Sequence, residues 1–356
     1  MPNSKVFYKN FPMLYVILSD SKYLKIFFKK QFMSEILSYT VTDELHGKRL
    51  DAALASFHDS NSRSVLGTLI KDGKVKVDGV VTTKPSVKVA SGQVIELEEP
   101  ERDDLEAKPQ DIPLDVVNED EDLIVINKPI GLVVHPGAGC KDGTVMNAML
   151  YHYPQTASLP RAGIVHRLDK DTSGLMVIAL SKYAQIKLMR AISKHDVVRE
   201  YEAICEGLIT SGGTSEADIS RDPYNRTRMA VVCDGMGSEA ITHYRVMEQF
   251  REHTLIKLRL ETGRTHQIRV HMASIDHPLL GDVTYGGKRL KMMKGASEKL
   301  SKALREFRHQ ALHAAHIEFV HPIKGENMAF DAPLPEDFTN LIKLLREDEA
   351  LNGEKL

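Results

Sequence analysis

The stretch RAGIVHRLDKDTSGLMVIAL, residues 161–180, joins a polar loop to an apolar strand and constrains the fold more than any other part of the chain. Its second half, LMVIAL, is an uninterrupted apolar run of strand length, which predicts a buried strand. In the first half, Gly174 permits the positive φ that a sharp turn needs. Thr172 and Ser173 can hydrogen bond to the loop backbone and fix its shape.

Asp169 lies inside this loop, between Arg167 and Lys170. Nearby positive charge lowers the pKa of a carboxyl group, so we expect Asp169 to stay ionised and to act as a nucleophile or base. The competing interpretation is a surface loop whose charges pair with one another. Arg-Leu-Asp alone would favour that interpretation, so the assignment depends on the longer string and on the rest of the chain.

Two further segments strengthen a catalytic interpretation. VVREYEAICEG, residues 197–207, places Tyr201 in an alternating strand, and LETGRTHQIRVHMASIDHPLLGDVTYGG spans residues 260–287. A tyrosine in such a strand is usually a half-buried packing residue. Together with HRLDKDTSGL, residues 166–175, these strings resemble the RluA-type pseudouridine synthases.

The resemblance implies a role for each matching residue. Asp169 would be the catalytic carboxylate, Tyr201 would stack on the target base and help to move the proton at C5, and Arg269 would pair with Asp169. Arg167 would occupy the space left when the target nucleotide is flipped out of the RNA. The remaining candidates for substrate binding, which would shape the pocket wall, are Arg264, His266 and Gln267.

Residues 39–100 predict a small domain of two helices and short strands. GKRLDAALASF and SRSVLGTLIKDG have apolar residues at helical spacing, and Asp78-Gly79 is a hairpin turn signal. Arg49-Leu50-Asp51, Ser62-Arg63-Ser64 and LIKDGKVKVDG resemble the S4 RNA-binding domain. The resemblance implies that Arg63 and Lys71 contact RNA, whereas their charge alone would fit a solvated helix face.

The remaining segments complete the domain organisation. Residues 1–38 form an extension that we expect to be poorly packed, with Met33 as the true start. The acidic, proline-containing residues 101–114 predict a linker. Residues 115–345 predict the catalytic domain, and residues 346–356 predict a tail.

Composition excludes several classes of protein. The net charge is −2, so RNA binding requires local basic patches rather than a polycation. No apolar run approaches the ~20 residues that cross a bilayer. The 3 cysteines form no CxxC pair, which argues against disulfides and a cysteine-rich zinc site and favours a reducing cytoplasm. The histidine spacing and the absence of HExxH argue against a metal, and no cofactor motif is present.

The resemblance implies an α+β pseudouridine synthase fold, with a central mixed, mostly antiparallel sheet preceded by the S4-like domain. GDVTYGGKR and residues 294–338 are similar to the RluD branch of the family. That branch implies large-subunit ribosomal RNA as the partner, at clustered uridines in the helix 69 stem-loop of 23S RNA, and we expect a monomer. The alternatives are a synthase acting on other ribosomal or transfer RNA uridines, a non-catalytic RNA-binding protein, and a glycoside hydrolase using Asp169 and Asp171.

Overall fold

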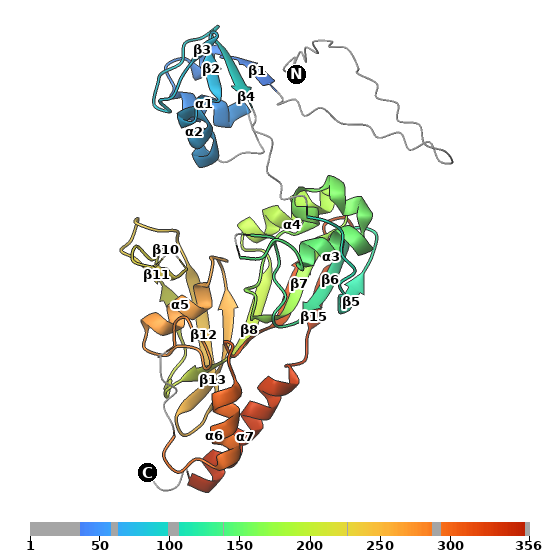
Figure 1. Cartoon of the computed structure of the whole chain (residues 1–356), viewed down its shortest axis with the longest axis vertical. Helices are drawn as coiled ribbons and strands as arrows, with labels where there is room; N and C mark the ends of the chain where they lie inside the picture. Colours follow the sequence, from blue (N-terminus) through green and yellow to red (C-terminus); the bar gives the residue numbers. More distant parts are fainter. Residues whose placement is uncertain are drawn as a thin grey trace, which may run out of the picture. The chain divides into compact units, whose positions relative to one another are not determined.

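The computed structural model of this 356-residue chain describes residues 36–57, 63–98, 107–137, 139–225, 227–286 and 293–352. The chain folds as two compact units, Met1–Glu106 and Ala107–Leu356 (Figure 1). The predictions for residues 1–35, including a start at Met33, and for residues 101–106 lie outside the described residues.

The first unit packs two helices on a four-stranded antiparallel sheet. The helices α1, Leu50–Phe57, and α2, Arg63–Lys71, occupy the two segments with helical apolar spacing. Their apolar faces form one core with the sheet. The strands lie in the order β1, Ile36–Thr40; β4, Val94–Glu98; β2, Val75–Val77; and β3, Val80–Val81.

The turns of this unit follow the predicted signals. Asp78 has φ 49° and Gly79 has φ 78°, and positive φ at both central residues is the type I′ geometry that joins β2 to β3. Gly73, with φ 74°, follows the end of α2. A short 3₁₀ turn, Asp43–Leu45, buries Leu45 beside the first helix.

The second unit is built on one large sheet. Its strands lie in the order β5-β6-β7-β14-β8-β13-β12-β9, and β15 pairs with β14. β7 and β14 are parallel and every other pair in the described sheet is antiparallel, which confirms the mixed, mostly antiparallel sheet. The strand bounds are β5, Val116–Glu119; β6, Leu123–Lys128; β7, Ser173–Ala179; β8, Val198–Glu206; β9, Gly213–Glu216; β12, Ile241–Gln249; β13, His253–Leu260; β14, Leu312–Val320; and β15, Asn327–Asp331.

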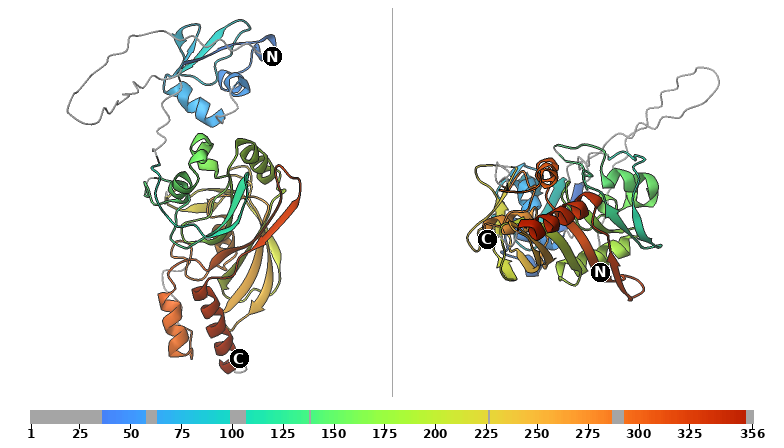
Figure 2. Two further views of the ribbon diagram at one scale, coloured as in Figure 1. Left: turned by 90° about the vertical axis from the view of Figure 1, so that its right-hand side faces the viewer. Right: turned by 90° about the horizontal axis from the view of Figure 1, so that it is seen from below.

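Helices cover both faces of this sheet. α3, Val145–His152, packs on one face, and α4, Lys182–Ser193, packs on the other (Figure 2). α6, Glu298–Glu306, and α7, Glu336–Asn352, form a further core with β8 and β13.

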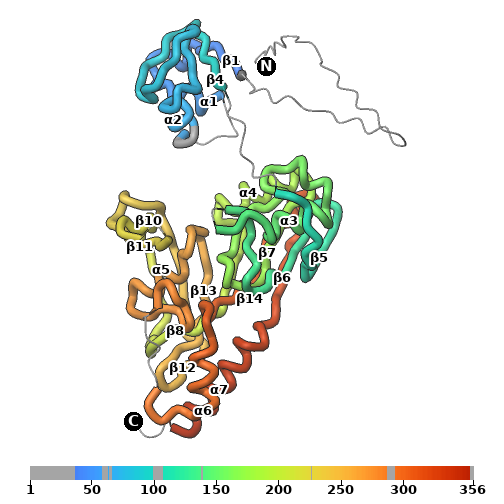
Figure 3. The backbone as a smooth tube through the Cα atoms, viewed as in Figure 1, coloured from blue at the N-terminus to red at the C-terminus, as the bar shows by residue number. Residues whose placement is uncertain are grey.

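The two ends of the sheet carry different smaller elements. α5, Gln267–Ser274, lies near the short hairpin of β10, Ile219–Arg221, and β11, Met229–Val231, at one end, whereas α3, β5 and β6 gather at the other (Figure 3). The 3₁₀ turns Pro154–Ser158 and Pro160–Gly163 follow α3 and lead into the loop before β7.

The central strands are buried for a reason visible in their composition. β7 is buried at every position, with Met176 and Ile178 facing one core and Leu175 and Val177 facing the other. The prediction of a buried strand from the LMVIAL run is therefore confirmed. β6 shows the same alternation between the two cores, which explains why DLIVINKP is apolar at consecutive positions.

Three domain boundaries differ from those expected. β1 begins at Ile36, inside the extension expected for residues 1–38, and pairs with β4. Residues 107–114 belong to the second unit, because Asn147 of α3 donates a hydrogen bond to the Lys108 carbonyl and His152 bonds to the Ile112 carbonyl. The boundary at residue 345 falls inside α7, which continues to Asn352 because Asp348 is buried in an ion pair with Arg251. No helix in the described part of the chain is both long and apolar enough to span a bilayer.

Gly174, the second residue of β7, has a backbone conformation and a close neighbour that allow only glycine. Its φ is +112°, and a Cβ would lie 2.2 Å from the Ala314 carbonyl oxygen on the parallel strand β14. We expect Gly174→Ala to lower the free energy of unfolding by roughly 2–5 kcal/mol, since positive φ and overpacking add. Urea unfolding checks this. Gly131→Ala is the control, because Gly131 has φ +84° but open space where the added methyl group would lie, so its loss should stay near ~1–2 kcal/mol.

Candidate active site

Three segments that are distant in sequence meet beside the sheet. The loop before β7 carries Asp169, β8 carries Tyr201, and α5 carries Arg269. Arg269 Nη1 donates a 3.0 Å hydrogen bond to Asp169 Oδ2, across 100 positions of sequence. The expected pairing of these two side chains is therefore present, and it aims the Asp169 carboxylate.

A second carboxylate, Asp282, holds the rest of the Arg269 guanidinium. Arg269 Nε and Nη2 donate to Asp282 Oδ2 and Oδ1 at 2.6 and 2.9 Å. Asp282 also accepts the backbone N–H groups of Thr284 and Tyr285, which, with the guanidinium, hold its pKa below the usual value despite burial. Arg269 thus reaches Asp169 with one nitrogen while the other two are locked, so its orientation is fixed by Asp282.

Tyr285 and His266 form one wall of the site. The Tyr285 hydroxyl accepts the Met229 N–H at 2.8 Å and lies 2.8 Å from His266 Nδ1, while the Arg269 guanidinium lies over the tyrosine ring at 5.0 Å. His266 Nε2 is 4.0 Å from Asp169 Oδ2. Burial lowers the pKa of His266 below its usual value, so the imidazole is neutral near pH 7.

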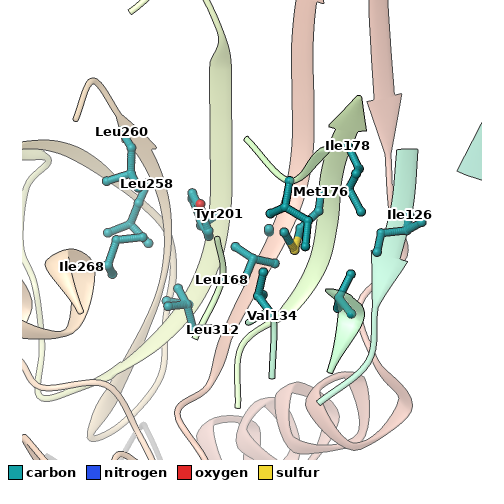
Figure 4. Close-up of a cluster of buried hydrophobic side chains, with 14 of the residues drawn as sticks. Ile126, Val134, Leu168, Met176, Ile178, Tyr201, Leu258, Leu260, Ile268 and Leu312 are labelled. Carbon is teal, nitrogen blue, oxygen red and sulfur yellow. The ribbon is translucent and has the colours of Figure 1, made fainter. Parts of the chain in front are cut away.

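Tyr201, by contrast, lies in an apolar part of the core. Its ring belongs to the buried cluster with Leu168, Leu258 and Leu312 (Figure 4). Burial raises the pKa of the Tyr201 hydroxyl, and the Asp169 charge also raises it, against the opposing effect of Arg199. The hydroxyl therefore stays protonated. Because this cluster is apolar and buried, electrostatic interactions of charged groups next to it are stronger than in water.

Lys128, at the end of β6, binds the backbone of the Asp169 loop. Its side chain is fully buried, and the ammonium donates to the carbonyls of Pro129, Leu132 and Lys170 at 2.8, 2.9 and 3.1 Å. Burial lowers the pKa of Lys128 to about 8, while the charges of Asp171 and Asp169 oppose that shift. A buried cation thus fixes the loop backbone next to Asp169.

We expected the Thr172 and Ser173 hydroxyl groups to bond to the loop backbone. Both bond instead to side chains that are distant in sequence. Gln310 Nε2 donates to Thr172 Oγ1 at 3.0 Å, and Ser173 Oγ lies 2.8 Å from His313 Nδ1. Both partners come from the chain around the start of β14. The reason for the difference is the parallel pairing of β7 with β14, which sequence spacing does not reveal.

The other residues expected at the site differ in exposure and in how many hydrogen bonds they already make. Arg167 is exposed, and its charge helps to lower the pKa of His266. Arg264 is exposed and donates from Nε to the Glu239 carbonyl. Gln267 is buried, and its amide bonds to Thr262, Arg264, Ile241 and Thr242, so it has no hydrogen-bonding group left for a substrate.

The RNA-contact candidates of the first unit are on its surface. Lys71 ends α2 and is exposed. Arg63 donates to Asp51 Oδ1 at 3.0 Å, and Arg49 binds the same carboxylate through two nitrogens. These bonds hold the pKa of Asp51 at about 2, so the carboxylate stays charged and orients both arginines.

Two buried histidines, His271 and His313, have protein partners. His271 lies within hydrogen-bonding distance of Thr242 Oγ1 and the Ala217 carbonyl, and His313 of Ser173 Oγ and the Ala332 carbonyl. Elsewhere in the described chain, Asp120, Asp122 and His321 lie together. The Lys324 ammonium binds Asp120 at 2.9 Å and already supplies a positive charge there.

Comparison of the sequence with known proteins identifies the family to which the chain belongs. Residues 122–274 match the family described as RNA pseudouridylate synthase, and residues 48–95 match the S4 domain. The Ribosomal large subunit pseudouridine synthase D of Vibrio vulnificus is 54% identical over 317 residues, which covers 89% of this chain and 97% of that protein. The chain belongs to the RNA pseudouridylate synthase family.

Other members of the family extend the comparison. The Escherichia coli protein named Ribosomal large subunit pseudouridine synthase D is 53% identical over 312 residues, covering 88% of this chain and 95% of that protein. Among solved structures, Human RNA Pseudouridylate Synthase Domain Containing 4 is 27% identical with a TM-score of 0.51, covering 65% of this chain and 93% of that one. The resemblance and the fold class inferred from sequence are confirmed.

The sequence alone did not single out Asp282, Tyr285 or Lys128. Asp282 and Tyr285 lie in the GDVTYGG string, whose resemblance to the family implied no role for these two residues. Lys128 is a charged residue at the end of the apolar strand β6. A lysine at such a position could have indicated a buried cation with protein partners, since charged residues are rarely buried without a partner.

Proposed function

We propose that this chain isomerises uridine to pseudouridine in large-subunit ribosomal RNA, with Asp169 as its essential carboxylate. The observation that carries the proposal is the 3.0 Å bond from Arg269 that aims Asp169, whose neighbour Leu168 belongs to the same apolar cluster as Tyr201. Two relatives more than 50% identical bear the name Ribosomal large subunit pseudouridine synthase D, and the S4 match adds an RNA-binding module.

The reaction breaks the N1–C1′ bond of uridine, turns the base and joins C5 to C1′. The target nucleotide has to leave its stacked position, which costs a few kcal/mol, and the exposed Arg167 side chain would fill the vacated space. Asp169 then acts at the sugar, either by adding to C1′ or by taking the proton from C2′. The locked Arg269 keeps the carboxylate aimed during this step.

The later steps move one proton. Once C5 is bonded to C1′, C5 loses its hydrogen and N1 gains one, so the composition of the RNA does not change. In the proposal the Tyr201 ring stacks on the freed base, and its protonated hydroxyl takes part in this transfer. Asp169, Tyr201 and Arg269 all come from one chain, so a monomer suffices for the chemistry.

Within the large subunit, we propose the clustered uridines of the helix 69 stem-loop of 23S RNA as the target. RNA is read mainly through shape and through splayed single-stranded bases, and a stem-loop offers both. Because this substrate is ribosomal RNA, the proposal also places the reaction in the cytoplasm.

Pseudouridine mapping tests the proposal. The purified chain is incubated with a transcript of the 23S stem-loop region, with transfer RNA and with a mutated loop in which the target uridines are cytidines. We expect pseudouridine at unchanged RNA mass in the stem-loop transcript alone. Abasic sites and free uracil would instead support a hydrolase, and no change in any RNA would support a non-catalytic RNA-binding protein.

A further inference from the structure

The Tyr285 hydroxyl has two hydrogen-bond partners, and together they fix the direction of its own proton. The Met229 N–H group donates to it at 2.8 Å, and His266 Nδ1 lies 2.8 Å from it. A backbone amide can only donate, so the hydroxyl oxygen accepts there and still has its proton to give. Among the described residues this hydroxyl has no other hydrogen-bond partner, so its proton points to His266 Nδ1.

This direction of donation decides which nitrogen of the His266 ring carries a proton. An imidazole is mostly neutral above pH 7 and then has a single N–H group. Burial lowers the pKa of His266 further, which favours the same neutral form. Because Nδ1 accepts the proton of the Tyr285 hydroxyl, the single N–H group of the ring is at Nε2.

The Nε2–H group of His266 is an unused donor beside Asp169. Asp169 Oδ2 is 4.0 Å from Nε2, which is too long for a hydrogen bond, and no other partner of Nε2 lies in the described part of the chain. The His266 side chain is 22% exposed and that of Asp169 is 16% exposed, so both remain open to a substrate. A polar group left without a partner in a site indicates that its acceptor arrives with the ligand.

Tyr285 is held by the same residues that aim Arg269. Asp282 Oδ1 accepts the Tyr285 backbone N–H at 3.0 Å, and the Arg269 guanidinium lies over the tyrosine ring at 5.0 Å. The planes of the Tyr285 and His266 rings meet at 80°. Asp282 thus positions Arg269 directly and His266 through Tyr285, and both of these side chains lie beside Asp169.

We propose that Tyr285 is a positioning residue that holds His266 as an Nε2–H donor to the 2′-hydroxyl oxygen of the target ribose. This inference rests on the proposed function, in which Asp169 acts at C1′ or C2′ of that sugar. The 2′-oxygen is bonded to C2′, so it lies within reach of a donor that is 4.0 Å from the carboxylate.

The chemistry of the sugar favours the 2′-oxygen over the ring oxygen as the acceptor. When a glycosidic bond breaks, positive charge develops at C1′ and is stabilised by electrons of the ring oxygen. A donor on the ring oxygen would withdraw those electrons, whereas a donor on the 2′-oxygen leaves them available. The 2′-hydroxyl is also the group by which a protein distinguishes RNA from DNA.

Nitrogen NMR of the full chain, labelled with nitrogen-15 in histidine, tests the tautomer without a substrate. We expect the His266 signals, assigned by their loss in His266→Gln, to show a protonated Nε2 and an unprotonated Nδ1. Tyr285→Phe keeps the ring but removes the hydroxyl, so the signals should shift toward a mixture of tautomers. Tyr153→Phe removes a hydroxyl that binds Glu119 and should leave them unchanged. A protonated Nδ1 in the wild type, or unchanged signals in Tyr285→Phe, would overturn the inference.

Two uncharged replacements of His266 test the donor in the reaction. A glutamine amide can place a donor near the Nε2 position, whereas an asparagine amide reaches only the Nδ1 position. We expect His266→Gln to keep kcat/KM within about threefold and His266→Asn to lower it about tenfold, as one lost hydrogen bond would. Tyr285→Phe should lower it several-fold and Tyr153→Phe should not. Equal losses in the two His266 variants would contradict a role for Nε2.

A deoxynucleotide identifies the acceptor. In Asp169→Asn, which is expected to bind RNA without converting it, 2′-deoxyuridine at the target position should raise the Kd of the 23S stem-loop transcript about fivefold. When His266→Asn is added to this variant, the two RNAs should bind within about twofold of one another. A difference that persists in the double variant would exclude the 2′-oxygen as the acceptor. A wild-type chain that forms no pseudouridine would instead refute the proposed function.

Discussion

Asp169→Asn is expected to reduce pseudouridine formation by at least about 10⁴-fold, because loss of a catalytic nucleophile costs this much or more in well-studied enzymes. Asparagine has nearly the same shape and keeps an oxygen that can accept from Arg269. It can neither add to C1′ nor take a proton from C2′. Tritium release from RNA labelled at C5 of uridine measures the rate, and filter binding should give a Kd within a few-fold of the wild type.

Asp171→Asn is the matched control for this prediction. Asp171 lies two residues along the same loop, and its charge acts on the buried Lys128. We expect activity to fall by less than about tenfold, since the loop loses part of its support without losing the reacting group. Two results would contradict the assignment of Asp169 as the reacting carboxylate. One is an Asp169→Asn variant with more than about 1% of wild-type activity, and the other is a larger loss of activity in Asp171→Asn than in Asp169→Asn.

Asp282→Asn is expected to have the second largest effect, on both stability and turnover. The Asp282 side chain is fully buried and binds two nitrogens of Arg269, so neutralising it removes the charge that compensates a buried guanidinium. Breaking such a pair costs about 3–5 kcal/mol of stability. We also expect kcat to fall by about 10²-fold with little change in KM, because a loosened Arg269 misplaces Asp169 and small displacements at a reacting group have costs of this order.

Asp348→Asn separates the two effects. Asp348 is a buried carboxylate that binds Arg251 through two nitrogens, at 2.8 and 3.2 Å, in the core formed with α7. It therefore matches Asp282 in burial and geometry but not in its link to Asp169. Urea unfolding should show comparable losses for both variants, while kcat falls in Asp282→Asn alone. Equal kcat values in the two folded variants would show that Asp282 has only a structural role.

The charges in the candidate site explain why Asp282 matters for chemistry. One guanidinium serves two carboxylates, so the group formed by Asp169, Arg269 and Asp282 keeps a net negative charge. His266 beside it is neutral near pH 7, because burial lowers its pKa. Asp169 is thus aimed by a cation without being fully neutralised, which is what the proposed reaction of this carboxylate at the sugar requires.

Local sequence determined much of this protein. The LMVIAL run and DLIVINKP contain apolar side chains at consecutive positions, which is the pattern of strands buried on both faces. Asp78-Gly79 is sufficient for a type I′ turn, because both residues tolerate positive φ. The strings around Asp169, Tyr201 and Arg269 also identified the family and the residues to compare.

Only the tertiary structure decided which side chains support the loop that carries Asp169. Gln310 reaches Thr172 across 138 positions and His313 reaches Ser173 across 140, because β7 and β14 are parallel neighbours in the sheet. The contact of Asp282 with Arg269 and the burial of Lys128 likewise depend on how distant segments pack. Periodicity and spacing report the local preferences of the backbone, whereas a hydrogen bond between distant residues depends on strand order and register, which short-range sequence patterns do not contain.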